Sequence, residues 1–417
     1  MSDRPVFHVS TFQETMAGLE YRQPAGRSVD LFSQACVEEL PRMESDRFDY
    51  RLSQVFEPDV LHEVAVLSGV PFTAMAELEH RPTSTAARLA RLVETAADLP
   101  AVSLVNLATA LISVSRFTPA ARLLARVRSM TADPRTVFET AMLSFVVSNR
   151  RDDGAGSAAA FYGMRQAIET GALPADRTMD ACAQAVVWYL KRQEIPEAAY
   201  RWFAATGQAL SADPEKLSAG AVSSWYRALA MVPAAAGEAA ATRRFMQFAR
   251  DAAEDTFAHR PRSYEQHFVK TYLESSLKEH MYVTHDQDKA EEAGRALIEL
   301  DPVWSPSYGE LAEAQTHFGR HGRAAELYED AVALGAPYLG HHLLQAARSR
   351  QRNGDGEQAL AHYVTLADLV PENESVLTAG LALAGRFSTV AKGRFDAALT
   401  CLKTRQQTAA RPSRGAR

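Results

Sequence analysis

The chain has 417 residues, of which 47% are hydrophobic and 23% are charged, and its formal net charge at pH 7 is −6. These proportions are ordinary for a folded protein and exclude a disordered, fibrous or collagen-like chain. Because the C-terminal segment from Lys403 holds basic residues but no acid, the rest of the chain is more acidic than the total indicates, which argues against broad nucleic-acid binding by long-range attraction.

The three cysteines, Cys36, Cys182 and Cys401, lie far apart and have no CxxC spacing. This pattern predicts buried thiols in a reducing compartment rather than a disulfide framework or a zinc site. The N-terminus has no basic region followed by a long apolar run, and the longest apolar stretches, such as 141–147, are too short to cross a membrane. We therefore expect a cytoplasmic protein with no membrane partner.

Residues 1–95 are predicted to form an N-terminal helical region. Within it, the small, turn and core positions of Val60–His80 are spaced as in a helix-turn-helix: Ala65, Gly69, Val70, Met75 and Leu78. The segment resembles the repressor-like helix-turn-helix family over about twenty residues. Its second helix, however, would expose Phe72, Thr73, Ala74 and Glu77, none of which supplies a cation or an amide to bases or phosphates. We therefore favour an ordinary helical hairpin that caps the rest of the chain.

From residue 96 the apolar spacing predicts successive helix pairs. In the first pair, the residues expected in the core are Leu107, Ala108, Phe117, Ala120, Leu124 and Val127, and Asp133-Pro134 ends the unit. The next pair, 136–173, is interrupted by the Gly-rich stretch Arg150–Ser157, which lacks the GK[ST] sequence of a phosphate-binding P-loop and is interpreted as a surface turn.

Three weaker pairs follow along the chain. In 179–210 the expected core positions are Ala185, Val186, Ala198, Trp202 and Ala205. In 222–253 they include Trp225, Ala228, Phe245 and Phe248, and in Ser263–Pro302 they include Ala290 and Leu297.

The stretch Ser305–Pro371 contains one pattern twice, with a period of about 34 to 35 residues, which is the length of one helix-turn-helix pair. Its first copy has Leu311, Ala312, Gly319, Ala324, Tyr328 and Ala331, and its second has Ala346, Ala347, Gly354, Ala359, Tyr363 and Leu366. Small residues allow the two helices to cross closely, glycine forms the turn, and tyrosine fills the space against the next pair. Each pair leaves an apolar side exposed until a neighbour covers it.

These residues resemble the tetratricopeptide repeat (TPR) family. The resemblance implies an all-α fold, a right-handed superhelical array of antiparallel helix pairs over residues 96–404, with the N-terminal region as a cap. A last pair is expected in Glu374–Lys403, with its turn at Gly393, which makes about eight pairs. Residues 405–417 are predicted to be a disordered basic tail because they hold too little apolar surface to pack.

The resemblance also implies that the first helices of the pairs form a concave groove for a peptide or a protein. The candidate groove residues are Tyr272, Glu279, Tyr282, Glu313, His317, His341, Leu344, Arg348, Gln351 and Arg352, with Gly309 beside them. Glu279, Glu313 and Arg348 occupy the position where the carboxylate-binding subclass has asparagine, so that subclass is not expected. Arg348 and Arg352 lie one turn apart and favour an acidic partner.

The pattern therefore predicts an adaptor or scaffold that binds a protein, without catalytic residues, cofactor or metal. His317 and His321 have the spacing of a metal pair, but Gly319 separates them by a turn. The alternative is a transcriptional regulator in which residues 60–80 contact DNA and the array senses a peptide or forms a homodimer. The acidic body of the chain makes DNA the less favoured partner.

Overall fold

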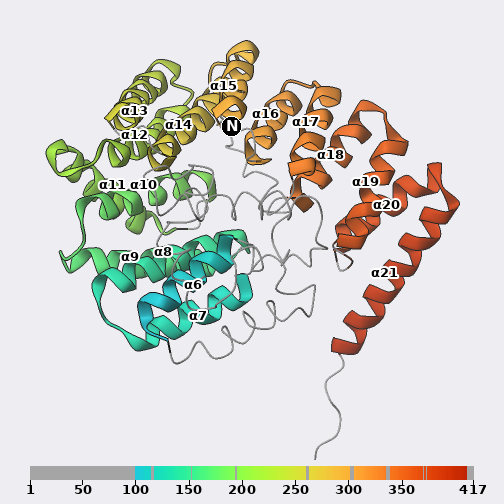
Figure 1. Ribbon diagram of the computed structural model, residues 1–417, viewed down its shortest axis with the longest axis horizontal. Helices are drawn as coiled ribbons and strands as arrows, with labels where there is room; N and C mark the ends of the chain where they lie inside the picture. Colours follow the sequence, from blue (N-terminus) through green and yellow to red (C-terminus); the bar gives the residue numbers. More distant parts are fainter. Residues whose placement is uncertain are drawn as a thin grey trace, which may run out of the picture.

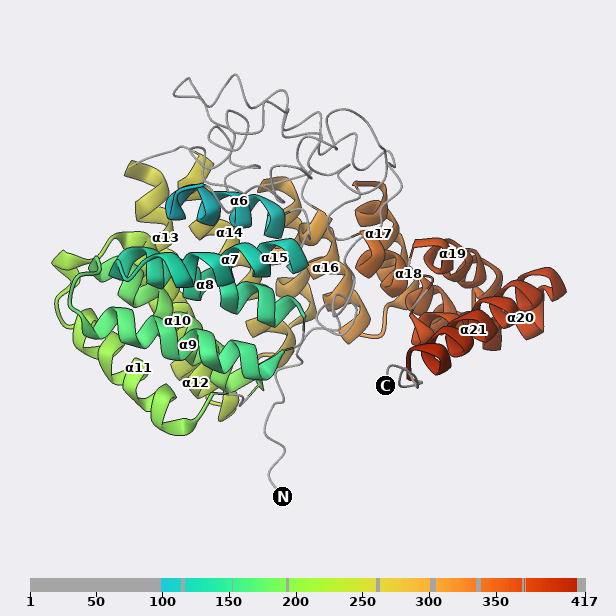
Figure 2. The same ribbon diagram turned by 90° about the horizontal axis from the view of Figure 1, so that it is seen from below.

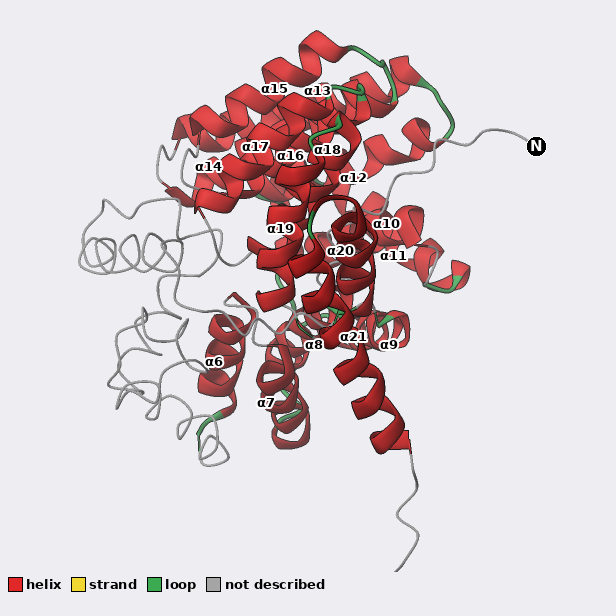
Figure 3. Cartoon of the chain, turned by 90° about the vertical axis from the view of Figure 1, so that its right-hand side faces the viewer, coloured by secondary structure: helices red, strands yellow, loops and turns green. Residues whose placement is uncertain are grey.

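The computed structural model describes residues 99–113, 117–151, 153–192, 195–259, 263–300, 305–334, 339–369, 371 and 373–410. The predicted N-terminal region, with its helix-turn-helix-like segment and Cys36, lies outside these residues. Within them the chain is helical and contains no strand, as Figure 3 shows. The prediction of an all-α fold is confirmed for this part of the chain.

Sixteen α-helices form eight consecutive pairs in the described part of the chain, which agrees with the number expected from the repeat pattern. The first four pairs are α6 (Ala101–Ser113) and α7 (Phe117–Met130), α8 (Pro134–Arg150) and α9 (Gly154–Glu169), α10 (Ala175–Arg192) and α11 (Glu197–Ser211), and α12 (Ala219–Ala235) and α13 (Ala239–His259). The last four are α14 (Ser263–Tyr282) and α15 (Gln287–Leu300), α16 (Ser305–His317) and α17 (His321–Leu334), α18 (Leu339–Asn353) and α19 (Gly356–Leu369), and α20 (Glu374–Phe387) and α21 (Thr389–Ala410).

The pairs follow one another in a curved row, which Figure 1 shows from α6 to α21. In the middle of the row the first helices of neighbouring pairs also pack on each other: α10 on α12, α12 on α14, and α14 on α16. Beyond α16 the main packing runs from each helix to the next one in the chain, and Figure 2 shows α18–α21 extending away from the other helices. The middle of the array is therefore the part in which the first helices converge.

The two clear repeats have the packing expected from their sequence. The small residues and tyrosines of both copies are buried: Ala312, Ala324, Tyr328, Ala331, Ala346, Ala347, Ala359 and Tyr363. Gly319 and Gly354 have φ angles of 75° and 92°, a conformation that side chains disfavour, and each stands in the turn between the two helices of its pair.

An aromatic core joins the second to the fourth pair. The ring of Phe161 lies 4.8 Å from that of Phe145 and 5.7 Å from that of Phe203, and the Trp188 ring lies 5.2 Å from Phe145. This core corrects the prediction for α11, in which Ala198 and Ala205 are exposed and Phe203 and Gly207 are buried instead. The apolar face is displaced because Phe203 fills the space beside Phe161, while Gly207 leaves room for the ring of Trp225.

Of two predicted turns, the one in Arg150–Ser157 is shorter than expected, since the helices are interrupted only between Arg150 and Gly154, and the one at Gly393 is helical. The Gly-rich stretch after Arg150 forms the first turn of α9, where the Asp153 carboxylate accepts a hydrogen bond of 2.9 Å from the Gly156 amide. In the last pair the break falls at Ser388, whose hydroxyl accepts a hydrogen bond of 3.2 Å from the Ala391 amide. Gly393 therefore lies inside α21, because a capping serine precedes it.

The C-terminal helix differs from expectation in two further respects. Cys182 is buried as predicted, but Cys401 is exposed on α21. In addition, α21 continues to Ala410, beyond the predicted end of the array at 404, because arginine, glutamine and alanine have high helix propensity. In the described part of the chain, no helix combines the length and the apolar character that a membrane span requires.

Two glycines of α20 provide a test of how closely the last pair is packed. A Cβ atom on Gly380 would come within 2.3 Å of the buried Phe395 ring, whereas one on Gly385 would meet no atom within 4 Å. We expect Gly380→Ala to lower the free energy of unfolding by about 1–2 kcal/mol through overpacking. Gly385→Ala should raise it by about 0.5 kcal/mol because alanine favours a helix. Denaturant unfolding of both variants checks this, and equal effects would contradict it.

Candidate functional site

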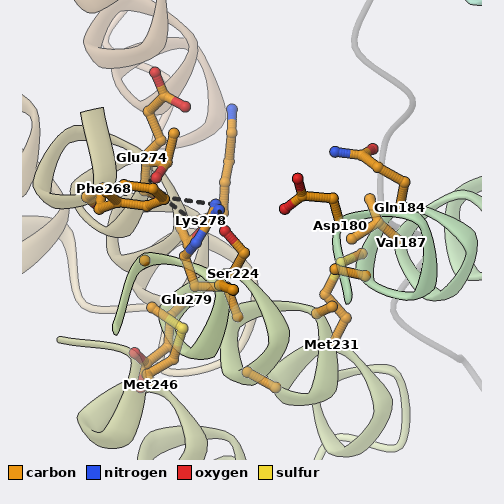
Figure 4. Close-up of a pocket in the computed structure, with 18 of the residues that line it drawn as sticks. Asp180, Gln184, Val187, Ser224, Met231, Met246, Phe268, Glu274, Lys278 and Glu279 are labelled. Atoms are coloured by element: carbon orange, nitrogen blue, oxygen red, sulfur yellow. Dashed lines mark hydrogen bonds between the residues drawn. The ribbon is translucent and has the colours of Figure 1, made fainter. Parts of the chain in front are cut away.

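A cavity of about 1050 Å³ lies where α10, α12, α14 and α16 converge. Figure 4 shows Asp180 and Gln184 of α10 on one side of it and Glu274 and Lys278 of α14 on the other, with α12 between them. All four helices are the first members of their pairs, so the cavity lies on the predicted concave face. A volume of this size is sufficient for several side chains of a bound segment.

The α10 wall presents a polar face that opens to the cavity. Asp180, Gln184, Val187 and Lys191 recur at helical spacing on this face, while the opposite face buries Cys182 in the aromatic core. Burial raises the pKa of the Asp180 carboxyl to about 6, even though the Arg177 guanidinium lies 3.0 Å away. Arg177 also forms an ion pair with Glu139 of α8, so one guanidinium is shared by two carboxylates.

The α12 wall carries Arg227, whose hydrogen bonds to described residues all go to neutral groups. Its guanidinium donates hydrogen bonds to the backbone oxygen of Thr271 at 3.2 Å, to the Ser275 hydroxyl at 3.5 Å and to the Ser224 hydroxyl at 3.3 Å. Burial lowers the pKa of Arg227 to about 10, so the side chain remains charged at pH 7. These bonds tie α12 to α14.

The wall formed by α14 and α16 is held by a charged cluster. The Lys278 ammonium group lies 2.7 Å from the Glu310 carboxylate and 2.6 Å from that of Glu313, and the Tyr282 hydroxyl donates a hydrogen bond of 3.1 Å to Glu313. Burial alone would lower the pKa of Lys278, but the two carboxylates outweigh it and raise the pKa well above its usual value. Burial likewise opposes the charge of Glu313, yet Lys278 and Tyr282 keep its pKa below the usual value.

Glu274 lies in the same wall but outside this cluster. No described residue donates a hydrogen bond to its carboxylate or forms an ion pair with it. Burial raises the pKa of Glu274, and Glu310 adds to that effect, while Lys270 and Arg227 oppose it. Glu274 is therefore a carboxylate whose charge the surrounding protein does not fully compensate.

The cavity brings together part of the predicted groove. Glu279, Tyr282 and Glu313 line it, as does Ser275. Tyr272 lies half-buried on α14, and the exposed His317 at the end of α16 places its ring 5.1 Å from that of Tyr282. That these residues bind a partner stays a prediction. The structure does show that four first helices of the predicted pairs, α10, α12, α14 and α16, converge around one cavity.

The predicted residues of α18 lie away from this cavity, whose described lining includes none of them. His341 and Leu344 are buried in the array, Arg348 is half-buried and contacts the Tyr363 hydroxyl, and Gln351 and Arg352 are exposed. Gly309 is likewise a packing position, since a Cβ atom there would lie 2.6 Å from the ring of His342. The structure therefore divides the predicted groove into two separate areas.

Sequence reasoning missed the residues that define the cavity most clearly: Asp180, Lys191, Arg227, Glu274 and Lys278. A signal was present, because Asp180, Gln184, Val187 and Lys191 form a helical stripe opposite the core positions of α10. The weaker repeats have no consensus to guide such an assignment, so their polar faces did not stand out. Within the described residues, no group of three or more histidine, cysteine or acidic side chains is arranged to hold a metal ion.

Comparisons with known proteins do not assign a family. No family model matches the chain, and no curated protein matches it. Three solved structures have some similarity to the chain. The first is the assembly chaperone of RpL4 (Acl4, residues 1–338), which is 14% identical over 75% of this chain and 100% of that one, with a TM-score of 0.30. The Naa15/Naa10 complex bound to HypK-THB matches at 14% identity over 84% and 68%, with a TM-score of 0.31. A circular tandem repeat protein matches at 14% identity over 91% and 96%, with a TM-score of 0.20. TM-scores of this size leave the family of the chain open.

Proposed function

We propose that the chain is a binding scaffold that holds a segment of a partner protein in the cavity between α10, α12, α14 and α16. The observation that supports this proposal most directly is the convergence of four first helices around a cavity of about 1050 Å³. The proposed role is binding rather than catalysis.

The lining is suited to a peptide because it combines apolar and polar groups on rigid elements. Val187 and Met231 offer apolar surface, while Gln184 offers a side-chain amide that is exposed to the cavity and bonded to no described residue. An extended segment has both apolar side chains and unpaired backbone groups, which such a surface can satisfy. The ion pairs of Lys278 hold the wall in place before a partner arrives, which reduces the entropy lost on binding.

A cavity-filling variant tests the proposal. Peptides are selected from an unbiased random library on the full-length chain, and their dissociation constants are measured by fluorescence anisotropy. Gln184→Trp should weaken the selected peptides by at least about tenfold, or about 1.4 kcal/mol, because the indole occupies the cavity. The matched control is Gln166→Trp, at an exposed position on α9 that does not line the cavity. The proposal is wrong if no peptide is selected, or if both variants bind like the wild type.

The arginines of α18 carry a separate prediction. If this helix contacts an acidic part of the partner, the double change Arg348→Glu and Arg352→Glu should weaken binding of an Asp- and Glu-rich peptide about tenfold. The double change should lower the melting temperature only slightly, because Arg348 is only half-buried, with its contact to Tyr363, and Arg352 is exposed. Arg323→Glu, an exposed charge reversal on α17, serves as the control. Unchanged affinity in the double variant would show that α18 does not contact the peptide.

A further inference from the structure

The charges that line the cavity do not balance. Acidic side chains outnumber basic ones seven to four among the described lining residues. Behind the lining, Lys270 and Arg243 add two cations and Glu139 adds one acid, so a surplus of two carboxylates remains. The Arg243 guanidinium lies 3.4 Å from the Glu279 carboxylate. Two of the four cations are already bound to carboxylates, Arg177 by Glu139 and Asp180, and Lys278 by Glu310 and Glu313.

The two other cations do not remove the surplus. Arg227 directs three of its five N–H donors to the oxygens of Thr271, Ser275 and Ser224, so most of its hydrogen-bonding capacity serves the protein itself. Lys191, exposed at the end of the α10 wall, faces Glu274, Glu310 and Glu313, so its one charge is shared among three carboxylates. Asp180 and Glu274 thus face the cavity from different helices with incomplete compensation, Asp180 keeping 35% of its side-chain surface exposed.

We propose that the cavity selects a segment that carries lysine or arginine, and that Asp180 on α10 and Glu274 on α14 bind its cationic side chains. This inference rests on the proposed scaffold function and names the chemistry of the partner. A guanidinium or ammonium group would donate charge-assisted hydrogen bonds to these carboxylates, which are about twice as strong as neutral ones. An acidic segment would meet the surplus of carboxylates and be repelled.

Binding of a cation should release protons near pH 6. The carboxyl of Asp180, whose pKa is raised to about 6, faces Arg177 and Asp176 on α10, Glu139 on α8 and Arg227 on α12. Glu274, whose pKa is also raised, faces Lys270 and Lys278 on α14, Arg227 on α12, Glu310 on α16 and Lys191 on α10. A bound cation favours the charged form of both carboxyls, so affinity should rise as the pH increases from 5 to 7.

The test compares two pools of labelled random peptides on the full-length chain, one containing lysine and arginine and the other aspartate and glutamate. The basic pool should bind at least about tenfold more tightly at low salt. Glu274→Gln and Asp180→Asn, which remove a charge without changing shape, should each weaken the basic pool about fivefold to tenfold. Both variants should fold, because each replaces a carboxyl whose charged form burial disfavours.

Glu292→Gln is the matched control, since Glu292 is an exposed acid on α15 outside the cavity. Calorimetry at pH 6 in buffers of different ionisation enthalpy should detect proton release on binding to the wild type and less of it in Asp180→Asn. Preferential binding of the acidic pool, or equal affinities in Glu274→Gln and Glu292→Gln, would overturn the inference. In that case, if peptides selected from the unbiased library still bind more weakly to Gln184→Trp, the scaffold function stands and only the preference for a basic segment is rejected. If no such peptide is found, both the scaffold function and the preference for a basic segment are rejected.

Discussion

Replacing Phe161 with alanine is expected to lower the free energy of unfolding by about 3–5 kcal/mol. The side chain is only 1% exposed, and its ring contacts those of Phe145 and Phe203. Removal of the ring would leave a cavity between the second and third pairs, which the surrounding helices cannot close because each is held by its own neighbours. Denaturant unfolding followed by tryptophan fluorescence measures the loss, since Trp188 belongs to the same aromatic core.

The adjacent residue provides the control for this experiment. Tyr162 is 64% exposed on the same helix, so Tyr162→Ala should change the free energy of unfolding by no more than about 0.5 kcal/mol. Because repeat arrays can unfold in parts, hydrogen exchange of α9 and α10 should be measured as well. We expect protection to fall in these helices and to remain in α18–α21. Similar losses for the two alanine variants would mean that the aromatic core does not join the pairs.

Replacing Lys278 with methionine is expected to destabilise the chain by about 3 kcal/mol at pH 7, because it removes the cation that forms ion pairs with both Glu310 and Glu313. We place the effect at the lower end for a broken buried pair, since the lysine, Glu310 and Glu313 keep 31%, 28% and 26% of their side-chain surface exposed. Unfolding of the purified variant in denaturant at pH 7 gives the value.

The pH dependence of this loss separates electrostatics from packing. In the wild type Glu313 has a lowered pKa, so its contribution to stability is complete above the ordinary pKa of a glutamate and is lost as the pH falls through the lowered one. Without Lys278, burial and the neighbouring acid should raise the pKa of this carboxyl, and the variant should lose stability as the pH rises. The difference between the two proteins should therefore shrink from pH 7 to pH 4.

An exposed lysine serves as the comparison. Lys289 is 52% exposed and pairs with Asp286, so replacing it with methionine should lower the free energy of unfolding by less than about 1 kcal/mol. A deficit in Lys278→Met that stays constant across this pH range would show that lost packing, not unpaired charge, explains the effect.

The helix pairs could be predicted from the sequence because their signals are local. Small residues and tyrosines at the spacing of helix contacts identified the repeat around Gly319 and Gly354, and the structure buries those residues as expected. Prediction failed where the consensus weakened. In α11 the face was displaced by one residue, and in α21 a capping serine moved the turn away from Gly393. Each error arose where a side chain from another helix, or a cap, outweighed the repeat spacing.

The candidate site could be predicted only in part. The first helices of the pairs were expected to line the concave face, and Glu279, Tyr282 and Glu313 do line the cavity. The α18 residues do not join them, because the packing of first helices on one another that runs from α10 through α12 and α14 does not continue beyond α16 in the described part of the chain. The spacing of apolar residues within one helix pair does not determine the angle at which that pair packs on the next.

By itself, the sequence determined that this part of the chain is a series of helix pairs, since helical periodicity depends on residues three and four positions apart. Only the tertiary structure decided where the pairs enclose a cavity and which charges meet in it. Gly220 leaves room for the ring of Phe268, and Arg227 of α12 binds the Thr271 oxygen of α14. Contacts of this kind set the angle between successive pairs, and those angles place Asp180 and Glu274 around one cavity although they are distant in the chain.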